Sequence, residues 1–275
     1  MAKRNKDNQE MSFLDHLEEL RWHLIRATLA VIIAATAAFF FKHFIFDVLL
    51  FGPSKADFWT YDIFCRITTA IGVDGGFCFD ELPFTIQSRT MGGQFSAHIW
   101  TAITAGFIIA FPYILYEIWR FISPALHPGE RSAAKGFIFV SSFLFFLGVL
   151  FGYYLVAPLS INFLGTYQVS EQVLNEFDLG SYISLVRSTV IASGLIFELP
   201  IVMYFLAKIG IVTPEFLKKN RKYAIILVLV LSGIITPPDI VSQTIVAIPI
   251  IILYEVSIII AKVVTKREKK KLQEL

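Results

Sequence analysis

Long apolar segments alternate with polar ones along the chain, and their lengths predict helices that cross a membrane. Six segments stand out, at residues 24–46, 97–121, 136–158, 182–207, 224–236 and 241–261. A spanning helix needs about 20 mostly apolar residues, so the fifth segment, with 13 residues, is short. Pro112, Pro200 and Pro249 interrupt three of the segments, and we therefore expect kinked helices.

An amphipathic segment precedes the first span. Leu17, Leu20 and Leu24 recur at helical spacing and fall on one face. Glu18 and Glu19 fall off that face. Helices that lie on a membrane surface usually carry a basic polar face, whereas this one is acidic. We therefore expect residues 1–23 to form a helix that either anchors at the interface or binds a cationic partner.

Lysine and arginine residues are distributed unevenly between the loops. Eighteen of them lie before the first span, between spans two and three, between spans four and five, or after the last span, whereas the other loops hold three. The positive-inside rule places the lysine- and arginine-rich loops in the cytoplasm. Both termini, including the basic tail 262–275, are then cytoplasmic. This requires an even number of spans, which is why we count the short fifth segment.

The composition agrees with a membrane protein. Apolar residues make up 56% of the chain and charged residues 17%, and the mean hydropathy is +0.66. A soluble domain is about 25% charged, and one this apolar would expose too much hydrophobic surface. A net charge of +2 gives no reason to expect nucleic acid as a partner. The fold class is therefore predicted to be all-α, as a polytopic integral membrane protein with six spans.

The exported loop 47–96 contains both cysteines of the chain, Cys65 and Cys78. An oxidising exterior favours a disulfide between them. Two free thiols are the alternative. The spans from 24 to 261 and this loop form one domain in our prediction.

Two charged residues interrupt the fourth predicted span. Glu198 lies near its middle and Arg187 precedes it by eleven residues, which is about 16 Å along a helix. A charge at this depth is costly and normally faces a partner or a wet cavity. We interpret the pair as an intramembrane polar site. The alternative is a protonated, packed glutamate that binds a neighbouring helix.

The sequence contains no pattern typical of an enzyme. It has no glycine-rich nucleotide loop, no HExxH and no GxSxG, and its five histidines are not at metal-ligand spacing. We predict no catalytic residues, no metal and no cofactor.

Four motifs, in this order, resemble the TatC family, the polytopic core subunit of the twin-arginine protein translocase. They are 13–21 (FLDHLEELR), 118–126 (IWRFISPAL) with the pair at 130–131, 197–200 (FELP) and 236–243 (TPPDIVSQ). The loop 47–96 is longer than is usual in that family, and its two cysteines are a departure. The resemblance covers the rest of the chain.

The resemblance implies specific roles for named residues. Carboxylates of the N-terminal helix and the first inner loop bind signal peptides that carry consecutive arginines, and forked guanidinium groups suit carboxylates. The implied signal-peptide site contains Glu19, Glu130, Arg21, Pro112, Phe121 and Pro124. Glu198 is implied to face a concave cavity within the bilayer. The residues implied to receive partner subunits are Asp239, Gln243 and Glu255.

The sequence thus predicts a receptor in the bacterial cytoplasmic (inner) membrane. Its partners would be twin-arginine signal peptides of folded cargo, single-span TatA/TatB-type subunits, membrane lipid and further copies of itself. The proton-motive force would drive export. One alternative is a proton-coupled small-solute transporter that uses Glu198 and Arg187, and another is a structural scaffold that tolerates substitution of Glu19, Glu130 and Glu198.

Overall fold

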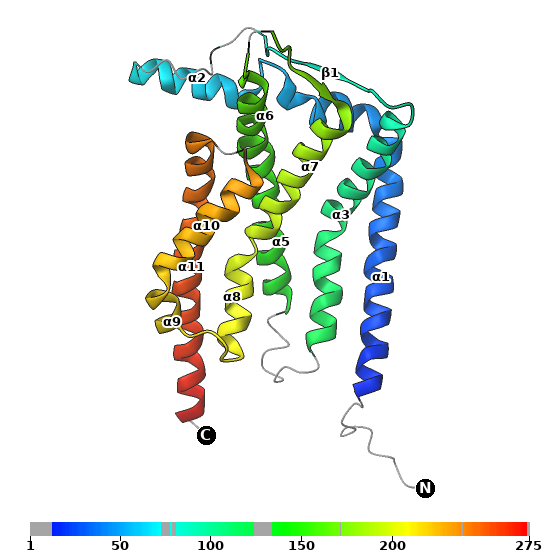
Figure 1. The fold of residues 1–275 in the computed structure, drawn as a ribbon. Helices are drawn as coiled ribbons and strands as arrows, with labels where there is room; N and C mark the ends of the chain where they lie inside the picture. The colour runs from blue at the N-terminus through cyan, green and yellow to red at the C-terminus, as the bar shows by residue number, and fades with distance from the viewer. Residues whose placement is uncertain are drawn as a thin grey trace.

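The computed structural model describes residues 13–72, 78, 81–123, 134–170, 172–237 and 239–273, and long helices dominate it (Figure 1). Its elements in chain order are α1 (Phe13–Phe40), the π-helix η1 (Phe44–Leu50), the 3-10 turn η2 (Gly52–Ser54), α2 (Trp59–Ile71), β1 (Thr85–Gln87), α3 (Gly93–Ile122), α5 (Ala134–Phe151), the π-helix η4 (Gly152–Val156), α6 (Ala157–Thr166), β2 (Glu176–Asp178), α7 (Leu179–Ile196), α8 (Leu199–Lys208), α9 (Pro214–Lys219), α10 (Arg221–Ile235) and α11 (Ile240–Gln273). The predicted helical, polytopic class is confirmed. The two three-residue strands, which pair in parallel, are the exception.

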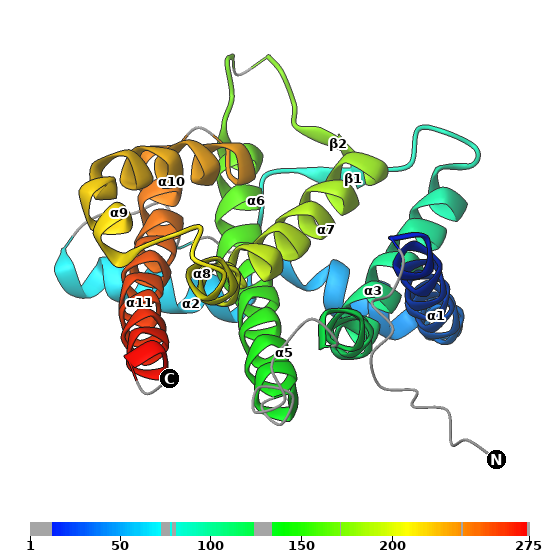
Figure 2. The ribbon, with the colours of Figure 1, turned by 90° about the horizontal axis from the view of Figure 1, so that it is seen from below.

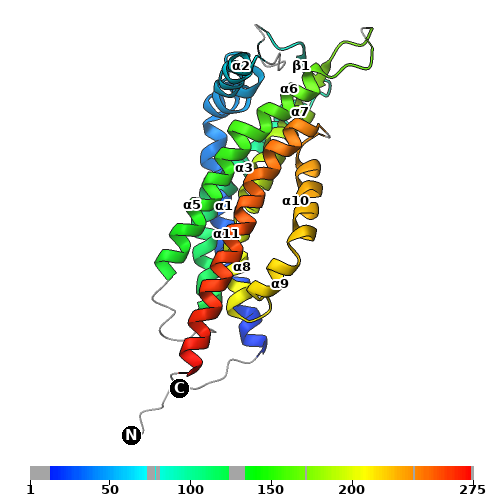
Figure 3. The same ribbon diagram turned by 90° about the vertical axis from the view of Figure 1, so that its left-hand side faces the viewer.

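Within the described residues, five helical segments are long and apolar enough to cross a membrane. They are Leu17–Phe40, Gly93–Ile122, Gly136–Thr166, Leu179–Lys208 and Ser242–Lys266. The predicted fifth segment corresponds to α10, whose 15 residues extend about 22 Å, less than the hydrocarbon core of about 30 Å. Even so, α10 leads from the end of the molecule where α8 stops to the end where α11 begins (Figures 1 and 3). The start of α1 and the end of α11 therefore lie at the same end, and the cytoplasmic orientation of that end stays a prediction.

The third span is longer than the sequence suggested. Our prediction ended it at Pro158, but the helix continues from α5 through η4 and α6 to Thr166. Pro158 lies in the first turn of α6, directly after the π-helical turn. A proline in a first turn removes no hydrogen bond that the helix needs, and so it did not mark an end here. The connection to the fourth span is correspondingly shorter than the predicted spans, which end at 158 and resume at 182, would leave.

The fourth span is two helices rather than one kinked helix. Helix α7 ends at Ile196 and α8 begins at Leu199, with Phe197 and Glu198 between them. Pro200 occupies the first turn of α8, where it is tolerated for the same reason as Pro158. By contrast, Pro112 and Pro249 lie inside the continuous helices α3 and α11.

The long helices form a spread layer instead of a closed bundle. Seen from below, they extend from α11 on one side, through α8, α5 and α3, to α1 on the other (Figure 2). Helix α1 packs mainly on α3, α3 also contacts α5 and α7, and α11 contacts both α8 and α10. Helix α1 therefore depends on a single neighbour for its position.

Small residues allow close approach where this layer is held together. A Cβ atom added to Gly106 of α3 would lie 2.5 Å from the backbone nitrogen of Ala35 in α1. Gly148 and Gly152 bring the third span equally close to α7, since a Cβ atom on either would lie less than 3.0 Å from α7 atoms. Glycine at such positions lets two helices pack backbone to backbone, as is common in membranes.

A cap of short elements covers the end of the molecule opposite the termini. Helix α2 crosses this end at a steep angle to the spans (Figure 1). The hydroxyl of Tyr61 is buried and donates to the carbonyls of Pro53 and Pro158 at 2.9 and 3.1 Å. Burial raises the pKa of Tyr61 far above its usual range, so this hydroxyl stays a donor.

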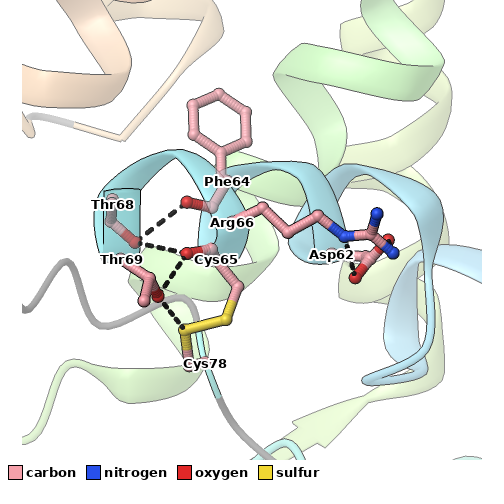
Figure 4. Close-up of a disulfide and its surroundings, with 7 residues drawn as sticks. All are labelled: Asp62, Phe64, Cys65, Arg66, Thr68, Thr69 and Cys78. Atoms are coloured by element: carbon pink, nitrogen blue, oxygen red, sulfur yellow. Dashed lines mark hydrogen bonds and ion pairs between the residues drawn. A yellow bond between two sulfur atoms is a disulfide. The ribbon is translucent and has the colours of Figure 1, made fainter. Parts of the chain in front are cut away.

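A disulfide joins the middle of α2 to the chain that follows this helix. Cys65 and Cys78 are bonded, and the Thr69 hydroxyl lies beside them (Figure 4). The bond closes a short loop with a sequence separation of 13 residues. By the entropic model, such a loop restricts the unfolded chain and stabilises the cap.

Replacing Gly106 with alanine is expected to lower the unfolding temperature of the detergent-solubilised protein. The added methyl group would overpack the contact between α1 and α3, which typically costs about 1–3 kcal/mol. Gly136→Ala is the matched control, because a Cβ atom at that position of α5 meets nothing within 4 Å. Thermal unfolding of both variants measures the difference. Equal unfolding temperatures of the two variants would contradict close packing of α1 on α3 at Gly106.

Candidate functional site

A buried carboxylate joins α1 to α3 near the end of the molecule where α1 begins. Glu117 of α3 is 1% exposed. Its Oε2 atom lies 2.5 Å from Nδ1 of His23 and 3.6 Å from Nη1 of Arg26. Its Oε1 atom accepts a hydrogen bond of 2.7 Å from the Tyr113 hydroxyl. Both oxygens of the carboxylate therefore have partners.

The position of these partners fixes how the two helices face each other. His23 and Arg26 are one turn apart on α1, and Tyr113 is one turn before Glu117 on α3. An unpaired carboxylate among apolar helices would cost several kcal/mol. Sliding or rotating α1 would break these contacts, so the cluster holds both helices in one register.

Two residues of the predicted signal-peptide site extend from this cluster toward the same end. Glu19 precedes His23 by one turn of α1, and Phe121 follows Glu117 by one turn of α3. The rings of Phe121 and His23 are 6.2 Å apart in an edge-to-face arrangement. The Oε2 atom of Glu19 is buried and has no hydrogen-bond partner among the residues described. Buried polar atoms normally have one, so this oxygen is a vacant acceptor.

The other predicted members of that site lie elsewhere. Arg21 is exposed and, two residues from Glu19, points from a different side of α1. Pro112 is half-buried in α3, five residues before Glu117. Glu130 and Pro124 lie outside the described residues. The structure therefore brings Glu19 and Phe121 near the cluster, and Arg21 is not part of that grouping.

Glu198 occupies the break between α7 and α8. It is 9% exposed, and its Oε2 atom accepts a hydrogen bond of 2.5 Å from the Ser141 hydroxyl of α5. Its Oε1 atom is buried and unpartnered within the described part of the chain. The contact with a neighbouring helix matches the packed alternative, while the free oxygen leaves room for a further donor.

Arg187 does not join Glu198 in one site. Its guanidinium lies over the ring of Trp100 in α3, with 5.5 Å between the carbon Cζ and the ring centroid. Glu198 instead contacts α5. Among the described residues no ion pair links the two side chains, so the pairing that a proton-coupled transporter would need is not present.

The three residues predicted to receive partner subunits bind the chain itself. Asp239 accepts a hydrogen bond of 2.8 Å from the backbone of Ser242 in the first turn of α11. The Gln243 amide donates to the Leu229 carbonyl of α10 at 2.8 Å. Glu255 of α11 forms an ion pair of 2.6 Å with Arg221 of α10. Gln243 and Glu255 therefore hold the short helix α10 against α11, while Asp239 caps the start of α11.

The described residues contain no cluster of three or more His, Cys, Asp or Glu side chains that could hold a metal ion.

The family model for TatC, described as Sec-independent protein translocase protein (TatC), matches residues 15–249. The chain belongs to the TatC family.

Relatives with the same description agree with this assignment along almost the full length. The TatC of Blattabacterium sp. subsp. Periplaneta americana (strain BPLAN) is 44% identical over 95% of this chain and 99% of its own. The TatC of Aquifex aeolicus (strain VF5) is 36% identical over 94% of this chain and 98% of its own.

Two solved structures, both crystal structures of the twin arginine translocase receptor TatC, are also similar. Each is 35% identical in sequence and covered to 99% of its length, with TM-scores of 0.66 and 0.68. Shares of 91% and 90% of this chain are matched.

Membership of the TatC family defines the broad function. The chain is a component of the Sec-independent protein translocase, a non-enzymatic transport subunit that works in a complex with other Tat subunits. Its apolar helices make it a multi-pass membrane protein.

Sequence reasoning missed the cluster that joins α1 to α3 near the end of this TatC-family chain where α1 begins. Glu117 was not singled out, and His23 was counted among scattered histidines. The argument that identified Glu198, namely a carboxylate inside an apolar span, applies equally to Glu117. His23 could be found only by knowing that α1 packs on α3.

Replacing Glu117 with alanine is expected to lower the free energy of unfolding by about 3 kcal/mol, because it leaves the buried His23 without its hydrogen-bond partner. Glu255→Ala is the control, since its partly exposed pair with Arg221 is worth about 1 kcal/mol or less. Thermal unfolding in detergent compares the two.

A double variant tests the cause of that loss. Replacing His23 and Glu117 together with leucine removes both polar groups, and this is expected to recover much of the stability. A double variant as unstable as Glu117→Ala would contradict a pairing role for the carboxylate.

Proposed function

We propose that this protein is the receptor and core subunit of a twin-arginine translocase. It binds the arginine pair of a signal peptide at the cytoplasmic face and organises partner subunits for export driven by the proton-motive force. It resides in the bacterial inner membrane with both termini in the cytoplasm and associates with further copies of itself.

The vacant acceptor on Glu19 is the observation that carries this proposal. Its Oε2 atom is buried without a hydrogen-bond partner among the residues described, and a guanidinium supplies several donors in a planar fork. Glu18, the residue before Glu19, is exposed to solvent. A partly buried carboxylate with a free oxygen holds a guanidinium more strongly than a solvated one does, because water competes less.

A second carboxylate completes the proposed site. Glu130 follows the last residue of α3, Ile122, by eight positions in the sequence. The cluster around Glu117 holds the end of α3 beside Glu19, which supports a role for both carboxylates in binding one arginine pair. Phe121 would supply an apolar wall next to the guanidinium stems.

We also propose that partner subunits dock on the surface formed by α10 and α11. Asp239, Gln243 and Glu255 would act by holding this surface in shape, since each contacts the protein itself. Exposed apolar side chains of α10, such as Ile226, Val230 and Ile234, would meet the single-span helix of a partner. The short α10 would also thin the bilayer locally and lower the barrier to cargo.

Replacing Glu19 with glutamine is expected to weaken binding of a twin-arginine signal peptide by roughly tenfold or more, because a charge-assisted hydrogen bond is lost. Glu130→Gln is expected to do the same. Fluorescence anisotropy with the detergent-purified protein measures both, alongside a twin-lysine peptide that wild type should bind more weakly.

Glu18→Gln is the matched control for that measurement. It removes the same charge one residue away, at an exposed position, and should leave the affinity within about twofold because exposed charges contribute little. Equal losses at Glu18 and Glu19 would indicate diffuse attraction instead of a site. If both Glu19→Gln and Glu130→Gln still prefer the twin-arginine peptide over the twin-lysine peptide as strongly as wild type does, these carboxylates do not bind the arginine pair.

Lengthening α10 by one apolar turn tests the proposed thinning. Four leucines inserted after Leu229 would add about 6 Å to the helix, and export of a folded reporter should fall while signal-peptide binding is retained. A conservative change of the same helix, Leu229→Ile, serves as the control. Normal export by the lengthened variant would contradict a role for the helix's short length.

A further inference from the structure

An apolar cavity opens between the exported halves of α1, α3, α5 and α7. Its volume is about 840 Å³, within the range of small-molecule sites. Apart from Arg187, two threonines and two tyrosines, its lining is aliphatic, alanine or phenylalanine. Such a cavity suits a hydrocarbon chain.

Arg187 marks the polar end of this cavity. It also lines a second, polar cavity of about 540 Å³ beside the start of α3, together with Thr90, Ser96 and Ser184. No carboxylate forms an ion pair with Arg187 within the described residues. Asp178 lines the same polar cavity and accepts hydrogen bonds from the backbone of Gly180 and Arg89 at 2.9 and 3.3 Å, and it forms no ion pair with Arg187. Among the described residues, the guanidinium therefore stands between an apolar and a polar cavity without an ion-pair partner.

A buried hydroxyl in the apolar cavity also lacks a partner. Thr101 is 6% exposed, and its Oγ1 atom has no hydrogen-bond partner among the described residues. This residue lines the same cavity as Arg187. A hydroxyl that is buried in this way normally donates to an acceptor, so an acceptor is missing from the site.

The depth of Arg187 in the bilayer suits contact with a lipid headgroup at the outer face of the same membrane. Arg187 follows Leu179, the first residue of α7, by eight positions, or about 12 Å. The middle of the span Leu179–Lys208 lies about 10 Å further along. A long arginine side chain that extends toward the nearer surface reaches the edge of a hydrocarbon half-layer, which is about 15 Å thick.

We propose that this cavity is a binding site for one anionic phospholipid of the outer leaflet. Arg187 binds the phosphate, the Thr101 hydroxyl donates to an ester oxygen, and an acyl chain fills the apolar cavity between α1 and α7. The site lies at the opposite end of α1 and α3 from Glu19, and the lipid stabilises the packing of α3 on α7. It does not depend on the proposed signal-peptide site, but its assignment to the outer leaflet rests on the proposed orientation with both termini in the cytoplasm.

Native mass spectrometry of the detergent-purified protein tests the site. Wild type, given equal amounts of phosphatidylglycerol and phosphatidylcholine, is expected to retain phosphatidylglycerol at least fivefold in excess. Arg187→Gln should abolish this preference, and Ala105→Phe, which fills the cavity, should lower retention of both lipids. Thr101→Val should weaken retention of both without changing the preference.

Arg66→Gln is the matched control, since it removes an exported arginine that is already paired with Asp62 at 2.9 Å. It should leave the preference unchanged. Equal retention of the two lipids by wild type, or the same loss in Arg66→Gln as in Arg187→Gln, would overturn the proposal. A photo-reactive residue in place of Ile109, which lines the cavity, would also overturn it if it cross-links to a polypeptide instead of lipid in cells.

Discussion

The packing of α1 on α3 is the contact on which the rest of this structure depends. Helix α1 packs mainly on this one neighbour, and a bilayer supplies no hydrophobic drive to hold the two together. Close approach at Gly106 and the hydrogen bond between Glu117 and His23 supply that attraction instead. Because Glu19 lies one turn beyond His23, the same contact determines where the proposed receptor carboxylate stands.

Much of the fold could be predicted from hydropathy and charge. The apolar segments correspond to α1, α3, α5, α7 with α8, α10 and α11, since in lipid a helix satisfies its own backbone and the apolar length alone defines a span. The ends were less predictable. Pro158 was taken as a stop, but a π-helical turn places it in the first turn of α6, and no sequence pattern announces such a turn.

Predictions for the site depended on which partner each residue meets. Glu198 was identified from its cost in the membrane, whereas its contact with Ser141 could not be foreseen, because it depends on how α5 packs against α7. For the same reason Arg187 was grouped with Glu198 along one helix, although the two contact different helices. Asp239, Gln243 and Glu255 are predicted at a docking surface. The contacts of Gln243 and Glu255 follow from α10 folding back on α11, and Asp239 caps the first turn of α11.

The charged groups inside the spans differ in whether all of their polar atoms have a hydrogen-bond partner, and this difference distinguishes their roles. Glu117 has a partner on each oxygen, so further binding there would require a contact to break; it suits a structural role. Glu19 and Glu198 each keep one buried oxygen without a partner among the described residues, and a carboxylate in that state gains from any donor that arrives. Arg187 has the opposite charge and lies at the opposite end of the helices. Glu19 thus offers an acceptor at the end where the proposed peptide would enter, and Arg187, which forms no ion pair among the described residues, lies toward the end proposed for a lipid headgroup. A ligand at one end need not compete with a ligand at the other.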